Sequence, residues 1–169
     1  MQNNFHILAL QGKSNVGKTD TLKMLIMRFI QSGFTAIEQS KNFSLLLDGK
    51  KFNGDVQATL AYGGKTVRIT TRGDTKAALE RDLDRYSKSD LCICAVHTHG
   101  ETVDFVKELT KNGSLHMYGK ATYYMFPEND EDASKKQTQT NSMQADMLFK
   151  EICFLVCGKK FLPQEPCSK

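Results

Sequence analysis

A glycine-rich segment near the N-terminus, residues 12–19 with the sequence GKSNVGKT, constrains the fold of this chain more than any other feature. It fits the pattern G-x-x-x-x-G-K-[ST]. The apolar run at residues 5–10 before it is typical of a buried strand. After it, apolar residues recur at helical spacing as far as Ser32, and Gly33 stands where a helix would end. The sequence therefore predicts a strand–loop–helix unit, which is the context that this pattern requires.

The residue types in this loop point to binding of a polyphosphate. Glycines let the backbone wrap closely around the ligand, and the main-chain N–H groups at a helix N-terminus attract anions. We expect Lys18 to bridge the β and γ phosphates and the Thr19 hydroxyl to bind Mg²⁺. The predicted nucleotide-binding residues are Gly12, Lys13, Ser14, Asn15, Val16, Gly17, Lys18 and Thr19.

The middle of the chain alternates between strand and helix patterns. Two strand-like runs, residues 56–62 and 65–70, flank Gly63-Gly64 and predict a β-hairpin. Residues 91–96 form a nearly continuous apolar run, as expected for a strand that is covered on both faces. Helical patterns follow the hairpin, near residues 78–86, and this strand, near residues 102–111.

The C-terminal third gives weaker signals. Residues 121–126 are a strand candidate, and the polar segment 127–140 is predicted to be a mobile loop. Asn141, followed three residues later by Gln144, is predicted to start a last helix that ends before Gly158. We expect one domain at residues 1–160 and a loose tail at 161–169.

These elements together predict an α/β fold of three layers, the P-loop NTPase fold. Its sheet should be mostly parallel, with one antiparallel strand supplied by the hairpin.

Composition limits the expected partners and cellular compartment of the protein. The net charge of +4 comes from 23 basic and 19 acidic residues spread along the chain, which does not indicate nucleic acid or a membrane as partner. No apolar run reaches the length of about 18 residues that a membrane span needs, and the N-terminus does not resemble a signal peptide. The five cysteines lie in apolar segments, so we expect reduced thiols and a cytoplasmic protein.

Several charged residues are candidates for metal binding and catalysis. Asp74 follows the strand at residues 65–70, where ligands bind in open α/β sheets, so it is predicted to hold Mg²⁺ and to act in catalysis; alternatively, Asp74 or Thr75 caps the next helix. Arg72 is a candidate for clamping a phosphate or else a solvated loop residue. Glu38 is a weaker candidate for metal ligand or general base. Residues 98–102 are expected to form a loop near the nucleotide.

Lys13 directly follows the first glycine of the loop, so that the segment reads G-K-x-x-V-G-K-T. This arrangement resembles the signature-lysine loop of the dimerising P-loop ATPases that partition chromosomes or target proteins. In those families the extra lysine reaches a nucleotide held by the partner subunit. The resemblance implies a homodimer in which Lys13 takes part in catalysis.

The whole chain also resembles small stand-alone bacterial P-loop ATP-binding proteins. The resemblance is carried by residues 12–19, by Gly73-Asp74 after the hairpin, and by the T-x-G-x-T sequence at residues 98–102. It implies a fold and ATP as ligand, but no particular reaction. The Asn-Lys-x-Asp sequence that reads guanine follows neither residues 91–96 nor residues 121–126, which favours ATP over GTP.

Three functions remain open at this point. The first is a slow Mg-ATPase that acts as a nucleotide-dependent switch, as a homodimer or with a protein partner. The second is a kinase that transfers the γ-phosphoryl group to a small acceptor held by residues 38–55, with Glu38 as base; the absence of arginine from residues 127–140 counts against it. The third is an ATP-binding module without turnover.

Overall fold

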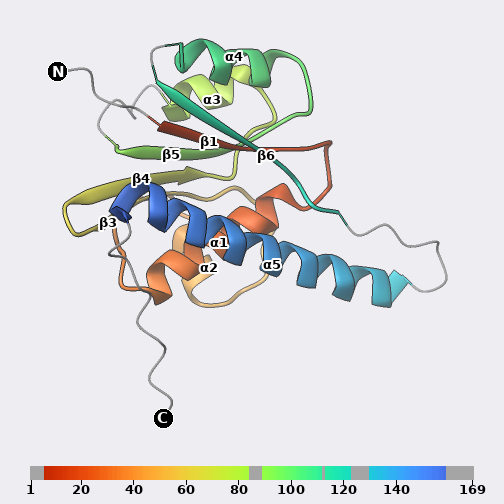
Figure 1. Cartoon of the computed structure of the whole chain (residues 1–169). Coiled ribbons are helices and arrows are strands. Elements are labelled where there is room, and N and C mark those ends of the chain that lie inside the picture. Colours follow the sequence, from red (N-terminus) through yellow and green to blue (C-terminus); the bar gives the residue numbers. More distant parts are fainter. Residues whose placement is uncertain (1–5, 84–88, 112, 123–129, 159–169) are drawn as a thin grey trace.

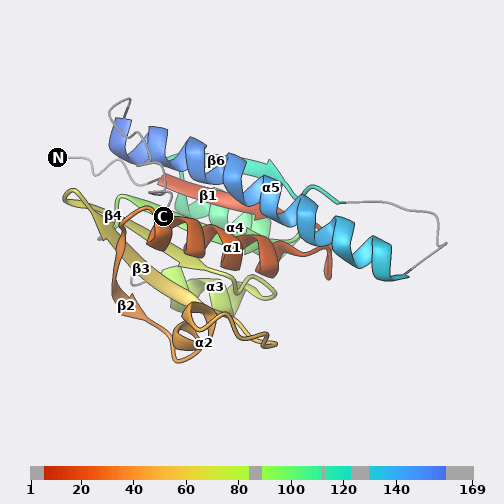
Figure 2. The ribbon, with the colours of Figure 1, turned by 90° about the horizontal axis from the view of Figure 1, so that it is seen from below.

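The computed structural model describes residues 6–83, 89–111, 113–122 and 130–158. Within these residues, six strands form one sheet in the order β2-β3-β4-β5-β1-β6 (Figures 1 and 2). The strands are β1 (His6–Gln11), β2 (Thr35–Gln39), β3 (Gln57–Tyr62), β4 (Lys65–Thr70), β5 (Leu91–Val96) and β6 (Ser114–Gly119). The helices are α1 (Lys18–Gln31), α2 (Phe43–Leu47), α3 (Lys76–Leu83), α4 (Glu101–Leu109) and α5 (Asp130–Cys157).

The sheet is mixed. Strands β4, β5, β1 and β6 pair in parallel, whereas β3 runs antiparallel to both of its neighbours, β2 and β4. The predicted hairpin is confirmed, since β3 and β4 are joined by Gly63 and Gly64 with φ values of 56° and 79°. An α/β class with a mostly parallel sheet is therefore confirmed.

Helices cover both faces of the sheet (Figures 1 and 2). One core contains Leu8 and Leu10 of β1 together with buried residues of α1, α2 and α5. The other contains Ile7 and Ala9 of β1 together with buried residues of α3 and α4. Because side chains alternate along a strand, β1 supplies apolar residues to both cores and is fixed from both sides.

Helices α1 and α5 lie side by side on one face (Figure 2). The ring of the fully buried Phe29 on α1 packs edge-on against Phe149 on α5, with 5.0 Å between ring centroids. At the edge of this contact Arg28 donates from Nε to Oδ1 of Asp146 at 2.5 Å. The C-terminal half of α1 is thus held between the sheet and α5.

The C-terminal third differs from the sequence prediction. The strand there is β6, at residues 114–119, whereas Ala121 and Thr122 belong to no strand and residues 123–126 lie outside the described part. The residues of β6 are half-buried or exposed, so they lack the strong apolar signal of an inner strand.

The prediction of a mobile loop at residues 127–140 is wrong for residues 130–140, which form the first turns of α5. This stretch is polar and has no apolar stripe. Its ion pair between Lys135 and Glu131 is of the i,i+4 type, which supports a helix without burial. Asn141 therefore lies inside the helix instead of starting it. The predicted tail, 161–169, lies outside the described residues.

Candidate functional site

The loop formed by residues 12–19, called the 12–19 loop from here on, connects β1 to α1 at the carboxyl edge of the sheet. The N–H of Gly12 donates to the carbonyl of Val96 on β5 at 3.2 Å. Two residues are left-handed, Asn15 with φ 59° and Gly17 with φ 87°. A Cβ on Gly17 would lie 2.8 Å from Oδ1 of Asn141 on α5, so glycine is required there both by backbone conformation and by space.

The Lys18 side chain turns back over the loop. Its ammonium donates to the carbonyl oxygens of Gly12 at 2.7 Å and Lys13 at 2.6 Å. Only 8% of the residue is exposed. Burial lowers the pKa of Lys18, and the nearby Asp74 carboxylate partly offsets this effect. Lys18 thus presents a desolvated cation at the centre of the loop.

A pocket of about 360 Å³ opens above the loop. The structure brings two of the predicted metal-binding residues, Thr19 and Asp74, into its wall together with Lys18. The full lining is Ser14, Asn15, Gly17, Lys18, Thr19, Asp20, Thr71, Asp74 and Ala95. Hydroxyl and carboxylate oxygens are the hard ligands that suit Mg²⁺, so the donor set fits the expected ion.

The approach of Asp74 to the loop depends on Gly73. A Cβ on Gly73 would lie 2.0 Å from the carbonyl oxygen of Ala95, so the chain after β4 packs directly on the backbone of β5. His97 Nε2 lies 3.3 Å from the carbonyl oxygen of Asp74. The cap of α3 is Thr75, whose Oγ1 accepts from the N–H of Ala78 at 3.2 Å.

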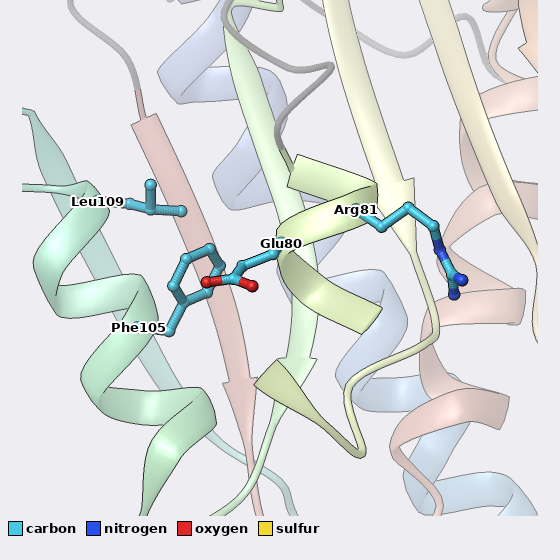
Figure 3. Close-up of a pocket in the computed structure, with 4 residues that line it drawn as sticks. All are labelled: Glu80, Arg81, Phe105 and Leu109. Carbon is cyan, nitrogen blue, oxygen red and sulfur yellow. The ribbon is translucent and has the colours of Figure 1, made fainter. Parts of the chain in front are cut away.

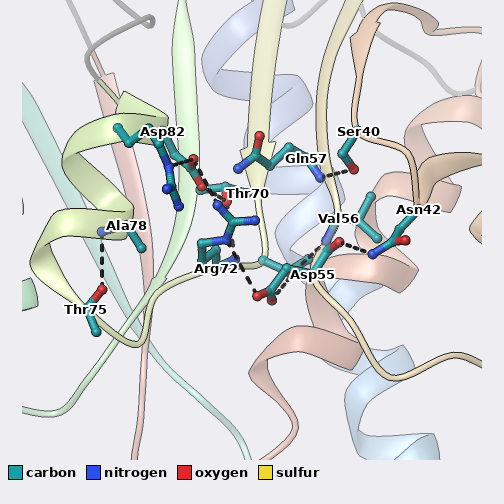
Figure 4. Close-up of polar contacts among 12 residues, drawn as sticks. Ser40, Asn42, Asp55, Val56, Gln57, Thr70, Arg72, Thr75, Ala78 and Asp82 are labelled. Carbon is teal, nitrogen blue, oxygen red and sulfur yellow. Dashed lines mark hydrogen bonds and ion pairs between the residues drawn. The ribbon is translucent and has the colours of Figure 1, made fainter.

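Arg72 and Glu38 contact residues outside the pocket above the 12–19 loop. Figure 4 shows Arg72 between two carboxylates, with Nε 3.7 Å from Asp55 Oδ2 and Nη1 3.6 Å from Asp82 Oδ1. Arg72 is not among the residues that line the pocket within the described part of the chain. Glu38 on β2 accepts hydrogen bonds from Thr59 of the neighbouring β3 and from Arg68 of β4, so it belongs to the sheet surface.

The remaining predicted residues lie around the loop. Lys13, Ser14 and Asn15 are exposed, so the Lys13 side chain faces solvent. The segment 98–102 lies beside the end of β1, since Gln11 donates from Nε2 to the carbonyl of Thr98 at 2.6 Å.

Two residues near the loop were missed by the sequence analysis. Thr71, 2% exposed, lines the pocket and donates from Oγ1 to Asp55 Oδ1 at 2.9 Å. Lys120 follows β6, and its N–H donates to the carbonyl of Gln11 at 2.7 Å. Burial lowers the pKa of Lys120 to about 8, against the opposing effect of Asp20. Correct placement of β6 would have revealed Lys120, because residues directly after parallel strands gather at one edge.

Two further cavities lie outside the 12–19 loop. One, of about 570 Å³, follows the outer side of α1 and is lined by residues of α1, α5 and the segment 46–53. The other, of about 380 Å³, lies between α3 and α4, where Glu80, Phe105 and Leu109 gather while Arg81 points away (Figure 3). Within the described residues, no group of three or more His, Cys, Asp or Glu side chains could hold a metal ion.

None of the described helices has the length and apolar character needed to span a membrane. Comparison of the chain with protein-family models, curated proteins and solved structures gives no match.

Proposed function

We propose that this chain is a P-loop NTPase that binds Mg-ATP in the 12–19 loop and hydrolyses it slowly, as a nucleotide-dependent switch. The observation that carries the proposal is the Lys18 ammonium, which is buried at the centre of the loop and bonded to two main-chain carbonyls. A desolvated cation beside a helix N-terminus is an arrangement that favours a polyphosphate.

The loop backbone, Lys18, Thr19 and Asp74 then have defined tasks. The main-chain N–H groups bind phosphate oxygens, and Lys18 exchanges its carbonyl partners for the β and γ phosphates. Thr19 and Asp74 hold the magnesium ion, which when bound neutralises charge that develops on the phosphates. Burial lowers the pKa of Lys18 in the free chain. Contact with phosphate raises this pKa again, because an anion stabilises the charged ammonium.

The setting follows from the same residues. ATP is preferred to GTP because the guanine-reading sequence is missing. The cytoplasm suits the free thiols of Cys92, Cys94 and Cys153. The exposed Lys13 is available to reach a nucleotide on a second copy of the chain, as in the families that its loop resembles.

Calorimetry with Mg-ATP tests the proposal. We expect saturable binding to the wild-type chain, no detectable binding to Lys18→Ala, and unchanged binding to Lys107→Ala, an exposed lysine on α4. If folded wild-type protein gives no heat with Mg-ATP or Mg-GTP, the proposal is wrong.

A second candidate, a small-molecule kinase, is favoured by the cavity beside α1. Residues 46–53, part of the segment expected to hold an acceptor, form one of its walls, and Asp20 lines both this cavity and the loop pocket. Labelled ATP and a panel of nucleosides and nucleotides separate the two functions. A phosphorylated acceptor favours the kinase, and phosphate release alone, rising with protein concentration, favours the switch.

A further inference from the structure

The cavity of about 570 Å³ beside α1, called the α1 groove here, adjoins the 12–19 loop at two points. Asp20 lines both cavities. Asn141, which also lines the groove, lies against Gly17 of the loop. The α1 groove therefore runs along α1 from Asp20 to Gln31, and its Asp20 end adjoins the 12–19 loop.

Lys23 in the wall of the α1 groove is a buried cation. Only 9% of the residue is exposed. Its Nζ donates to the carbonyl oxygen of Phe52 at 3.1 Å and lies 4.0 Å from the centroid of the Phe52 ring. Among the described residues, no carboxylate lies within ion-pair distance of it.

This environment leaves Lys23 with capacity to bind an anion. An ammonium has three N–H donors, and the structure assigns one of them to a carbonyl. Burial of a cation without an anionic partner is unfavourable. A ligand that brings a negative charge into the groove would remove this cost and complete the hydrogen bonds.

The rest of the groove indicates what kind of molecule carries that charge. Lys51 is an exposed cation at the groove, and within the described residues no carboxylate pairs with it either. In contrast, Arg28 is held by Asp146. The apolar part of the lining comes from Met24, Met27, Leu46 and Phe52. Two cations beside methionine and aromatic surface fit an anionic group that is attached to an apolar or planar body.

We propose that the α1 groove binds an organic phosphate monoester, with its phosphate at Lys23 and Lys51 and its body against Met24 and Phe52. The site goes beyond the ATP site and does not depend on it. The bound phosphate monoester lies near Asp20, which lines both the groove and the loop pocket.

Calorimetry on the full chain tests this site with inorganic phosphate and the four common ribonucleoside monophosphates as probes. The measurement is made with the loop filled by magnesium and an unhydrolysable ATP analogue, and again on Lys18→Ala without the analogue. We expect a monophosphate to bind in both cases, and more tightly than inorganic phosphate. Failure of ATP binding would overturn the proposed function alone, because the Lys18→Ala arm does not need it.

Substitution of Lys23 decides whether the lysine holds the ligand. Lys23→Met keeps an unbranched side chain of nearly the same length and removes the charge, so monophosphate affinity should fall about tenfold or more. Lys107→Met on α4 should leave it unchanged. Without ligand, Lys23→Met should unfold at the same or a higher temperature than wild type, because it removes a buried charge that has no carboxylate partner among the described residues. The monophosphate should raise the unfolding temperature of the wild type and not that of the variant.

Three results would overturn the proposal. They are no binding of any monophosphate, unchanged affinity in Lys23→Met, and binding of inorganic phosphate as tight as that of the monophosphates. If Lys23→Met does not fold, Lys51→Glu provides the same test from the exposed side of the groove. There, reduced affinity supports the proposal and unchanged affinity overturns it.

Discussion

Lys18 and Lys23 lie little more than one helical turn apart on α1, and each is a buried lysine that lines a cavity. Lys18 is held by two carbonyls of its own loop, within six residues of the chain. Lys23 is held by a carbonyl and a ring of Phe52, which is 29 residues away in sequence. Asp74 lies near the first lysine, whereas no described carboxylate pairs with the second.

A cation site can therefore be formed by one short segment or by segments that are far apart in sequence. The 12–19 loop carries its glycines, its lysine and its hydroxyl in one short segment, so the spacing of these residues in the sequence predicts the site. The α1 groove needs a helix, the segment 46–53 and α5 to meet. We therefore expect the two sites to respond separately to substitutions.

Substitution of Lys18 should have the largest effect, with substitution of Lys23 as the comparison. Lys18→Met should weaken Mg-ATP binding about a hundredfold or more, since charge-assisted hydrogen bonds to two phosphates are lost. Lys23→Met should leave ATP affinity within about twofold, because its ammonium faces the other cavity. Calorimetry on both variants under one condition checks this. Equal losses would show that the loop and the groove form one site.

Gly17→Ala should give the next largest effect, on stability. At φ 87° an alanine is strained, and its Cβ meets the buried Asn141, so the free energy of unfolding should fall by about 2–3 kcal/mol. Gly49→Ala is the matched control. It has φ 68° and no atom within 4 Å of an added Cβ, so the loss should be only about 1 kcal/mol.

Denaturant titration measures both variants. Asn141→Ala in the Gly17→Ala background should restore part of the difference between them, because it removes the crowded side chain. If Gly17→Ala is no worse than Gly49→Ala, the contact between the loop and α5 does not restrain Gly17.

The same contrast between local and assembled features explains how much the sequence could predict. The loop, the hairpin and the buried β5 depend on short-range patterns and are confirmed as structural elements. The environment of Lys23 depends on Phe52, and Arg72 is held by Asp55 and Asp82. No pattern of neighbouring residues encodes these pairs, because tertiary packing brings them together.

The C-terminal third shows a second physical reason. The helix α5 begins in a polar stretch, so periodicity gives no sign of it before Asn141. Inside that helix Gln144 donates from Nε2 to the carbonyl of Gly119 at 2.7 Å and accepts from the N–H of Ala121 at 2.9 Å. This polar side chain joins α5 to the end of β6, a role that a capping motif in sequence does not reveal.

Asp74→Asn should have a smaller effect than loss of Lys18, because it removes one of the oxygens predicted to bind the metal. We expect ATP affinity at limiting magnesium to fall about tenfold and to recover partly at high magnesium. Binding of monophosphate in the α1 groove should not change. Calorimetry over a magnesium series measures both, with Asp104→Asn on α4 as the control. An unchanged magnesium dependence would exclude Asp74 as a ligand.

Lys120→Met should give the smallest effect, visible only in the pH dependence of stability. Burial lowers the pKa of Lys120 from 10.5 to about 8, so between these values the folded chain has released a proton that the unfolded chain retains. The free energy of unfolding should therefore rise with pH across this window, and below about pH 8 the cost of the buried charge is fully present.

Denaturant titrations at several pH values should show this rise to be smaller in Lys120→Met than in wild type. Lys111→Met, an exposed lysine, should keep the wild-type slope. If the Lys120 ammonium faces the phosphates, a bound triphosphate should raise its pKa, because an anion raises the pKa of a neighbouring lysine. The part of the rise in unfolding free energy with pH that comes from Lys120 should then be smaller. An organic phosphate confined to the α1 groove should leave it unchanged. The pH dependence of stability that Lys120 causes, beside Gly12 of the loop, thus reports which of the two sites a ligand occupies.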